Sequence, residues 1–353
     1  MRTLLVLSVM FTACGGGSKR APERPKQDAV DEGTAEKDAK GLVQEIYGSI
    51  SHADTDGLMT LFAEPMVVFG PRKADAHATR ADALVALKAM VNPQKKPSLH
   101  SGQLTIVASP GGRSAWAFDV VDVSGTAVTL TAVLSNSDDV WQVSAATVAR
   151  TPSMKLVRES LKKDAVVPPG MAAGAKIEGA AKGAADKLTR GLNAQTLWGD
   201  ELAKRSDAVV IGPGSGEITH GKAEIKKLFA KRTDAHVRET AAGQVTAEAT
   251  ADGQLAWATV PVVRFEDDTD ALPLRVFAVF EKAGDDWKMI ALQESIAVDE
   301  PGVGAQYKTV VAPALPRAAA PEPVVTEEAA KPVKKHKKKQ KKQKKTPPAD
   351  EES

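Results

Sequence analysis

Few residues in this chain have the types and spacing needed for metal, phosphate or nucleophilic chemistry. The 353 residues include one cysteine, Cys14, which excludes internal disulfides and cysteine-cluster metal sites. The acidic run 266–270 lacks the glycine and distal glutamate of a calcium loop, so we interpret it as a solvated turn. The glycines of 212–216 lack the lysine that a phosphate-binding loop requires. We therefore expect no metal and no cofactor.

The charge of the chain is unevenly distributed. Lysine and arginine number 47 against 45 acidic residues, but ten of the lysines lie in 331–345, which leaves 37 − 45 = −8 for the remainder. We therefore do not expect a uniformly basic nucleic-acid-binding protein. Beyond residue 13, every apolar run is much shorter than the roughly 18 residues that span a bilayer.

The start of the chain has the order of an export signal. A positive charge at 1–2 is followed by a short apolar segment, 3–13, and then by Cys14. Residues 11–14 (Phe-Thr-Ala-Cys) resemble the lipobox of a bacterial lipoprotein signal, with Phe11 where the pattern has an aliphatic residue. This resemblance implies cleavage before Cys14 and lipid on its sulfur and amino group. The alternatives are a plain secretory signal or a buried N-terminal strand with a free thiol. We expect a signal with lipobox over 1–14 and a flexible tether over 15–37.

Internal similarity is the most informative feature of the sequence. Four short motifs recur in the same order at offsets of 142, 141, 141 and, counted on the tryptophan, 146 residues. The motif pairs are 67–71 with 209–213, 102–105 with 243–246, 115–117 with 256–258, and 138–141 with 285–287. A period near 140 is domain-sized and indicates duplication of a whole domain.

Within the first copy, helical patterns come first and strand patterns follow. Apolar residues at helical spacing over 42–50, a short helix at 56–62 and a capped helix opening at Thr79 surround one short strand at 67–69. From Leu104 the period changes to two, with turn signals between four strands. This order predicts an α+β fold in which helices pack on one face of a curved antiparallel sheet.

The residues that carry a family resemblance are the acidic turn 53–56, the leucine-rich helix 58–62, the Val-Val-Phe-Gly strand, and the capped helix before four strands. Together they resemble the SnoaL-like branch of the nuclear transport factor 2-like superfamily. The resemblance covers about 38–150 and, more loosely, 175–298, and it predicts two tandem cone-shaped domains. It implies a pocket that some members use for isomerase, cyclase or dehydratase chemistry, whereas many others only bind or dimerise through the sheet.

Isomerase chemistry in such a cone needs a carboxylate base and a proton donor inside an apolar cavity. The candidates are Tyr47 on the first helix and Asp119 and Asp122 on the strand of Trp116. Asp119 alternates out of phase with Trp116, so the two cannot face the same cavity. The second copy has leucine or valine at the three corresponding positions. We therefore assign these residues solvent-facing or packing roles and keep catalysis in the first copy as the alternative.

Four tryptophans stand at equivalent places of the two copies. Core packing is one interpretation, and an aromatic wall for a small apolar ligand is the other. The pocket-lining candidates are Trp116, Phe118, Trp141, Trp257, Arg275, Trp287 and Gln293.

The remaining segments are a linker, 151–174, and a tail, 299–353, that is rich in proline and alanine and then in lysine. The tail has no aromatic residue among its lysines, so it is poorly suited to nucleic acid. Near an anionic surface each lysine adds about 1 kcal/mol of attraction, which predicts docking on an acidic envelope polymer or lipid. The residues assigned to polyanion binding are Lys334, Lys335, Lys337, Lys338, Lys339, Lys341, Lys342, Lys344 and Lys345.

Together these patterns predict a lipid-anchored protein of the bacterial cell envelope, on the outer membrane or its periplasmic face. We expect its two domains to form a non-catalytic binding or structural module that pairs as a homodimer or within one chain. The alternative is an isomerase-like enzyme with the first domain active and the second degenerate.

Overall fold

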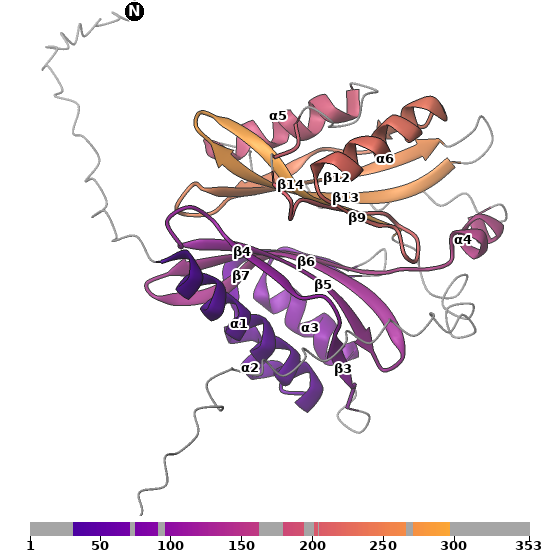
Figure 1. The fold of residues 1–353 in the computed structure, drawn as a ribbon. Coiled ribbons are helices and arrows are strands. Elements are labelled where there is room, and N and C mark those ends of the chain that lie inside the picture. Colours follow the sequence, from indigo (N-terminus) through magenta and orange to yellow (C-terminus); the bar gives the residue numbers. More distant parts are fainter. Residues whose placement is uncertain are drawn as a thin grey trace, which may run out of the picture. The chain divides into compact units, whose positions relative to one another are not determined.

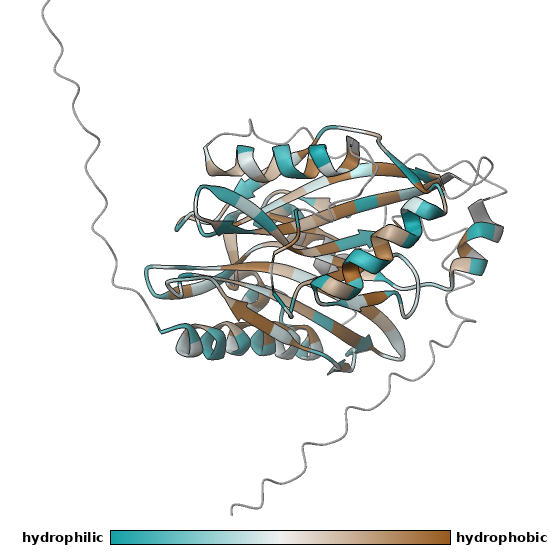
Figure 2. Ribbon diagram, turned by 45° about the horizontal axis from the view of Figure 1, so that its top comes forward, coloured by the Kyte–Doolittle hydropathy of each residue, from teal (hydrophilic) through white to brown (hydrophobic). Residues whose placement is uncertain are grey.

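The computed structural model describes residues 31–70, 75–90, 96–161, 179–193, 201–203, 205–265 and 271–296. These residues form two domains of the same design within one compact unit of the chain. In each domain, helices cover one face of a curved sheet: α1, α2 and α3 in the first, α5 and α6 in the second (Figure 1). Apolar residues are concentrated in the strands, whereas the helices alternate polar and apolar residues (Figure 2).

The first domain contains three helices and seven strands in the described part of the chain. They are α1 (Glu32–His52), α2 (Thr55–Thr60), β1 (Phe62–Phe69), β2 (Ala76–His77), α3 (Arg80–Met90), β3 (Leu99–Ser101), β4 (Thr105–Ala108), β5 (Ser114–Val123), β6 (Thr126–Ser137) and β7 (Val140–Arg150). A further helix, α4 (Met154–Leu161), follows.

The second domain repeats this order with the helix corresponding to α2 missing from its described residues. Its elements are α5 (Ala180–Asn193), β8 (Val209–Ile211), β9 (Ile218–His220), α6 (Lys222–Asp234), β10 (Arg238–Ala241), β11 (Thr246–Ala249), β12 (Leu255–Phe265), β13 (Ala271–Ala283) and β14 (Asp286–Ser295).

The two seven-stranded sheets have the same strand order. It is β2-β1-β7-β6-β5-β3 in the first sheet and β9-β8-β14-β13-β12-β10 in the second, with β4 and β11 also pairing with β5 and β12. The long strands are antiparallel, and the predicted α+β class with two cone-shaped domains is confirmed. In addition, β1 runs parallel to β7 and β8 parallel to β14. A parallel neighbour needs a long connection, and the intervening elements of each domain supply it.

The pairing registers of the two sheets coincide at the offsets found in the sequence. In the first sheet Trp116 lies opposite Val133, and in the second sheet Trp257 lies opposite Val279. The two tryptophans are 141 residues apart in the sequence, and the two valines are 146 residues apart. A register shift follows directly after Val133 in the first sheet and after Val279 in the second. The extra residues of the second domain therefore fall in its β12–β13 connection, where a hairpin lengthens at little cost.

Helix α1 begins at Glu32, inside the segment 15–37 that its composition predicted to be a tether. Asp31 caps the helix by accepting a hydrogen bond from Thr34 N at 3.1 Å. Ala35 and Ala39 are fully buried against the sheet. The composition was misleading because small alanines, not large apolar groups, anchor the first turns of this helix.

The sheet faces turned away from the helices pack against each other, and we call this contact the interdomain seam. Phe69 and Phe277 meet edge to face with ring centroids 6.4 Å apart, and Trp257 stacks on Phe277 at 6.0 Å. The buried apolar residues of the seam are Phe69, Val107, Trp116, Phe118, Val120, Val133, Ala145, Ala203, Val209, Ile211, Leu255, Trp257, Phe277, Val279, Ile290 and Ala291. Burying a large apolar side chain stabilises a fold by about 1.5–3 kcal/mol. The seam is therefore an apolar core in addition to the helix-side core of each domain.

The segment that leaves the first domain is attached to the second. Val157 of α4 is 1% exposed and belongs to the helix-side core of the second domain. Just before α4, the carbonyl of Pro152 accepts a hydrogen bond from Ser215 N at 2.9 Å. The stretch predicted as linker, 151–174, therefore begins with a docked helix.

Candidate functional site

Tyr47 and Asp119 meet inside the first domain, between α1 and β5. Asp119 follows Ala115 and Ala117 on the helix-facing side of β5 and is completely buried. Its Oδ2 accepts a hydrogen bond from Tyr47 Oη at 2.9 Å, and its Oδ1 accepts one from Gln103 N at 3.0 Å. Asp119 therefore does not face solvent, because both faces of β5 are covered.

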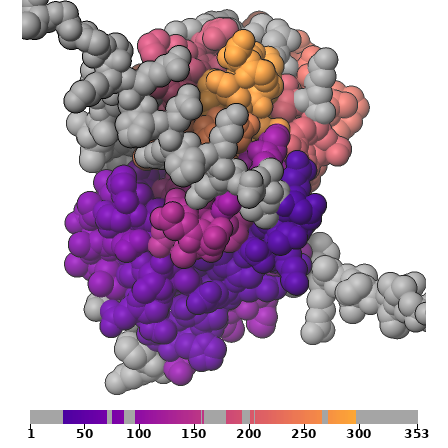
Figure 3. All heavy atoms as spheres, turned by 90° about the vertical axis from the view of Figure 1, so that its left-hand side faces the viewer, coloured from indigo at the N-terminus to yellow at the C-terminus, as the bar shows by residue number. Residues whose placement is uncertain are grey.

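The electrostatics of this pair favour the protonated form of the Tyr47 phenol. Burial, with the negative charge of Asp119, raises the pKa of Tyr47 above its usual value. A phenol and a carboxylate in an apolar interior have the groups that proton transfer requires. Here, however, protein donors occupy both carboxylate oxygens of Asp119. On the face shown in Figure 3, the indigo and violet atoms of the first domain form a closed surface.

Asp122 is not brought to this pair. Its Oδ1 accepts a hydrogen bond from Gly125 N at 2.7 Å. Ser124 and Gly125 both have positive φ, of 52° and 85°, in the tight turn between β5 and β6. Asp122 is therefore a turn-capping residue.

The seven pocket-lining candidates are divided between the two faces of the sheets. Trp141 and Trp287 lie on the helix side, in the cores of the first and second domains. The other five lie on the opposite faces, in or beside the interdomain seam: Trp116, Phe118, Trp257, Arg275 and Gln293. The candidates therefore do not converge on one cavity, because alternate residues of a strand face opposite sides.

A charged cluster that the sequence reasoning missed lies inside the second domain. Arg264 donates from Nε to Glu239 Oε1 at 2.7 Å, and its Nη2 lies 2.5 Å from Glu294 Oε1. Arg232 of α6 holds both oxygens of Glu294, at 2.7 and 2.9 Å. The side chains of Glu239 and Glu294 are completely buried. Two arginines thus balance two glutamates away from water.

The two glutamates of this cluster titrate in opposite directions. Burial and the charge of Glu294 raise the pKa of Glu239. Burial also opposes ionisation of Glu294, but Arg232 and Arg264 outweigh it and lower the pKa of Glu294 to about 2. The signal in the sequence was Arg264 itself, which continues the alternation of Ala256, Ala258, Val260 and Val262 on the buried face of β12.

Neither domain repeats the polar interior of the other. At the offsets of 141 and 146 residues, Asp119 corresponds to Val260, and Glu294 corresponds to Val148. The two sheets have kept their registers, whereas their helix-side interiors have diverged.

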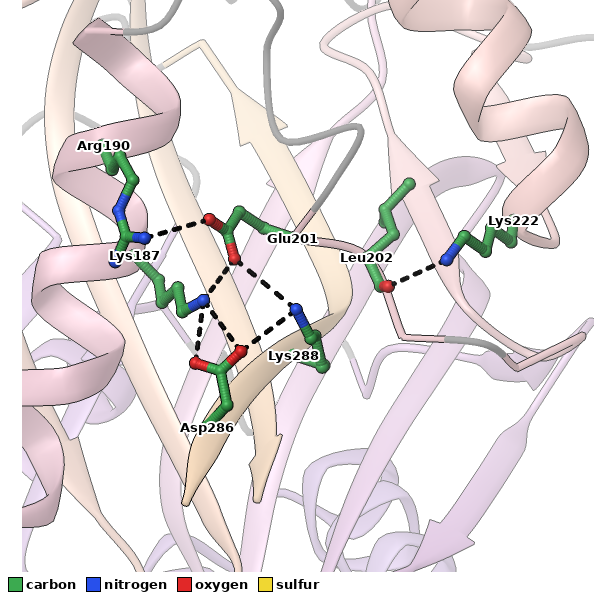
Figure 4. A network of polar contacts seen from close by, with 7 residues as sticks. All are labelled: Lys187, Arg190, Glu201, Leu202, Lys222, Asp286 and Lys288. Carbon is green, nitrogen blue, oxygen red and sulfur yellow. Dashed lines mark hydrogen bonds and ion pairs between the residues drawn. The ribbon is translucent and has the colours of Figure 1, made fainter. Parts of the chain in front are cut away.

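An ion-pair network at one end of the second domain ties three segments together (Figure 4). Lys187 of α5 reaches Glu201 at 2.5 Å and Asp286 of β14 at 2.8 Å. Lys288 and Arg190 add contacts of 3.1 Å to Asp286 and 3.6 Å to Glu201. The hydrogen bond from Lys187 lowers the pKa of Asp286. Because these ion pairs join α5, the segment at Glu201 and β14, we assign the network a structural role.

A shallow surface depression lies at the start of α6, lined by residues that include Arg205, His220 and Lys222. Arg205 holds Asp207 through two parallel hydrogen bonds, from Nε and from Nη2, both 2.9 Å long. The Nη1 of Arg205 also donates to Glu281 at 2.6 Å. The arginine of this depression is thus already neutralised by the protein.

Within the described ranges, no group of three or more histidine, cysteine, aspartate or glutamate residues could hold a metal ion. No described helix is long and apolar enough to cross a membrane. Cys14, the acidic run 266–270 and the lysines of the tail lie outside the described residues.

Comparisons with known proteins give a family match for part of the chain. Residues 194–299 match the family described as SnoaL-like domain. No curated protein matches the chain. Similar solved structures include a nuclear transport factor 2-like protein of unknown function from Pseudomonas putida KT2440, at 15% identity over 36% of this chain and 93% of that chain, with a TM-score of 0.32. Another is a cystatin-like fold protein of unknown function from Nostoc punctiforme PCC 73102, at 12% identity over 36% of this chain and 97% of that one, with a TM-score of 0.29.

Proposed function

We propose that this chain is a lipid-anchored protein of the bacterial cell envelope in which two SnoaL-like domains act as a non-catalytic binding or structural module. The second SnoaL-like domain is the one matched at 194–299. The assignment of the first to the same family is supported by its equal strand order and its equal pairing register.

The observation that carries the proposal is the interdomain seam. Each sheet buries its broad apolar face, including Trp116 and Trp257, against the other domain of the same chain. In the helix-side interiors, Asp119 and the cluster around Arg264 are held by partners from the protein itself. A molecule built in this way offers a rigid two-domain body.

Cutting the connection between the domains tests the pairing of the sheets. A recognition sequence for a site-specific protease, placed within 164–175, lets the purified chain be cleaved without denaturant. We expect the two fragments to elute together in gel filtration, because the seam and the docked helix α4 hold them. Fragments that separate at micromolar concentration would contradict the pairing.

The lipid anchor needs its own test. With Cys14 replaced by serine, we expect incorporation of labelled palmitate to be lost and the protein to move from the membrane fraction to the soluble fraction. Equal membrane association of both proteins would remove the anchor from the proposal. In the same fractions, deletion of residues 321–353 is expected to abolish the salt-sensitive part of envelope binding that we assign to the tail lysines.

A second candidate function is isomerase-type chemistry in the first domain. The hydrogen bond between Tyr47 and the buried Asp119 favours it, since this pair joins a proton donor to a carboxylate. If it were correct, Asp119→Asn would abolish a turnover that the unchanged protein shows, and Asp122→Asn would leave that turnover intact. Equal rates in both variants would remove this candidate.

A further inference from the structure

Arg275 is a buried cation in the interdomain seam whose hydrogen-bonding capacity is largely unused. The residue is 2% exposed, and its guanidinium carbon lies 4.8 Å from the centroid of the Phe69 ring. Nη1 donates to the carbonyl of Gly70 at 3.1 Å. Nε and Nη2 are buried and have no hydrogen-bond partner among the described residues.

These two nitrogens are the ones with which an arginine holds a carboxylate side-on. Their N–H bonds point in the same direction, so they can form two parallel hydrogen bonds to the two oxygens of one carboxylate. The same chain contains this arrangement in its filled form, where Arg205 uses Nε and Nη2 to hold Asp207. Arg275 has the same pair of donors, and no described residue accepts a hydrogen bond from either of them.

Other polar groups of the seam lie on strands next to Arg275 or to the Phe69 that it covers. Gln293 lies diagonal to Arg275 on the same face of the second sheet and donates from Nε2 to Thr129 Oγ1 at 2.9 Å across the seam. Thr131, two residues after Thr129 on β6, lies opposite Thr147 of β7 in the first sheet. Thr147 in turn lies opposite Phe69 of β1, whose ring is covered by Arg275. The buried atoms of these polar residues that have no partner among the described residues are Arg275 Nε and Nη2, Thr131 Oγ1 and Gln293 Oε1.

Leaving such groups unpaired is costly. A buried polar atom without a partner destabilises the fold, and a charged one does so more strongly. Burial lowers the pKa of Arg275 to about 10, and the nearby charge of Asp75 only partly opposes this shift. Arg275 therefore remains a cation at neutral pH.

We propose that the interdomain seam holds a small carboxylate, bound side-on by Arg275 Nε and Nη2 and hydrogen-bonded by Thr131 Oγ1. Phe69 and Phe277 lie beside the site and suit an apolar body on the ligand. Gln293 Oε1 is an acceptor, which favours a ligand that also carries a hydroxyl group. The ligand would contact both domains, so its binding would strengthen their pairing.

The test uses the full-length protein with acetate as the probe. Acetate replaces chloride at constant ionic strength, and acetamide serves as the neutral analogue. We expect the thermal midpoint to rise with acetate in a saturable way and to stay flat with acetamide. Arg275→Lys keeps the positive charge but removes the two parallel donors, Nε and Nη2, which we call the fork. The lost hydrogen bond is expected to weaken acetate binding at least about tenfold. Arg205→Lys is the matched control, because its fork is already filled by Asp207, and it should keep the response.

An equal response to acetate in the Arg275→Lys protein would overturn the proposal. Should that variant fail to fold, a crystal structure of the unchanged protein soaked in bromoacetate decides the question. Carboxylate oxygens in the fork with a bromine signal beside them would support the site. A fork filled by water alone, or by the side chain of Asp75, would overturn it.

This inference rests on the pairing of the sheets but not on the lipid anchor. Fragments that separate after cleavage between the domains would remove both the pairing and the carboxylate site. Fragments that stay together without a response to acetate would remove the site alone.

Discussion

Replacing Glu294 by glutamine is expected to cost the second domain about 3 kcal/mol at pH 7. The carboxylate of Glu294 is completely buried and lies between Arg232 and Arg264. Its pKa falls from 4.5 to about 2 on folding. At about 1.4 kcal/mol per pKa unit, this shift corresponds to roughly 3 kcal/mol. Breaking a buried ion pair by removing one partner typically costs about 3–5 kcal/mol, which agrees with that size.

Glu239→Gln is the matched control, because it replaces the other buried carboxylate of the cluster around Arg264 by the same amide. Burial raises the pKa of Glu239, so its charge contributes less to the folded state than that of Glu294. We expect this substitution to cost less than about 1 kcal/mol. Amide hydrogen exchange in β12 and β14 reports the stability of the second domain alone. It therefore measures the loss of free energy of unfolding in both variants.

The pH dependence of this cost follows from the sign of the shift. A carboxylate whose pKa is lower in the folded state stabilises the fold above its unfolded pKa and loses that contribution as the pH falls. The gap between the unchanged protein and Glu294→Gln should therefore be complete above about pH 5 and close toward pH 2. Equal losses for the two glutamine variants, or a gap that persists at pH 2, would refute the reasoning.

Three further substitutions, one of them with a matched control, test other parts of the structure by amide exchange in the strands of the domain that each one alters. Phe277→Ala removes a fully buried ring from the seam and should cost about 3–5 kcal/mol, and a loss below 1 kcal/mol would mean that the seam opens in solution. Tyr47→Phe leaves one oxygen of the buried Asp119 without its donor and should cost about 1–3 kcal/mol, confined to the first domain. Gly183→Ala places a methyl group 2.4 Å from the indole of Trp287 and should cost about 1–3 kcal/mol. Its control, Gly41→Ala in α1, meets nothing within 4 Å and should stabilise by about 0.5–1 kcal/mol.

Local patterns predicted the elements well, because short-range rules govern them. The capping pattern at Thr79 is confirmed by the hydrogen bond from Asp82 N to Thr79 Oγ1 at 3.1 Å. The alternation around Trp116 correctly separated it from Asp119, since the two lie on opposite faces of β5. The offsets between motifs correctly predicted which strands of the two copies correspond.

What covers each face was not predictable from those patterns. Trp116 could line a pocket or pack on another sheet, and alternation alone does not distinguish the two. The first eight residues of β5 are all buried, which is the signature of a strand covered on both sides. The cluster around Arg264 was not predicted, although Arg264 is in phase with the buried apolar residues of β12.

Tethering also changes how the seam depends on concentration. Two separate sheets that associate must meet by diffusion, and they come apart when the protein is dilute. When both sheets belong to one chain and the connection is short, the effective concentration of one sheet near the other is in the millimolar range. The contacts across the seam also join non-equivalent positions, such as Arg275 with Gly70 and Gln293 with Thr129. Substitutions in one domain can therefore accumulate independently of the other domain. The two domains are also always present in a one-to-one ratio, whatever the expression level.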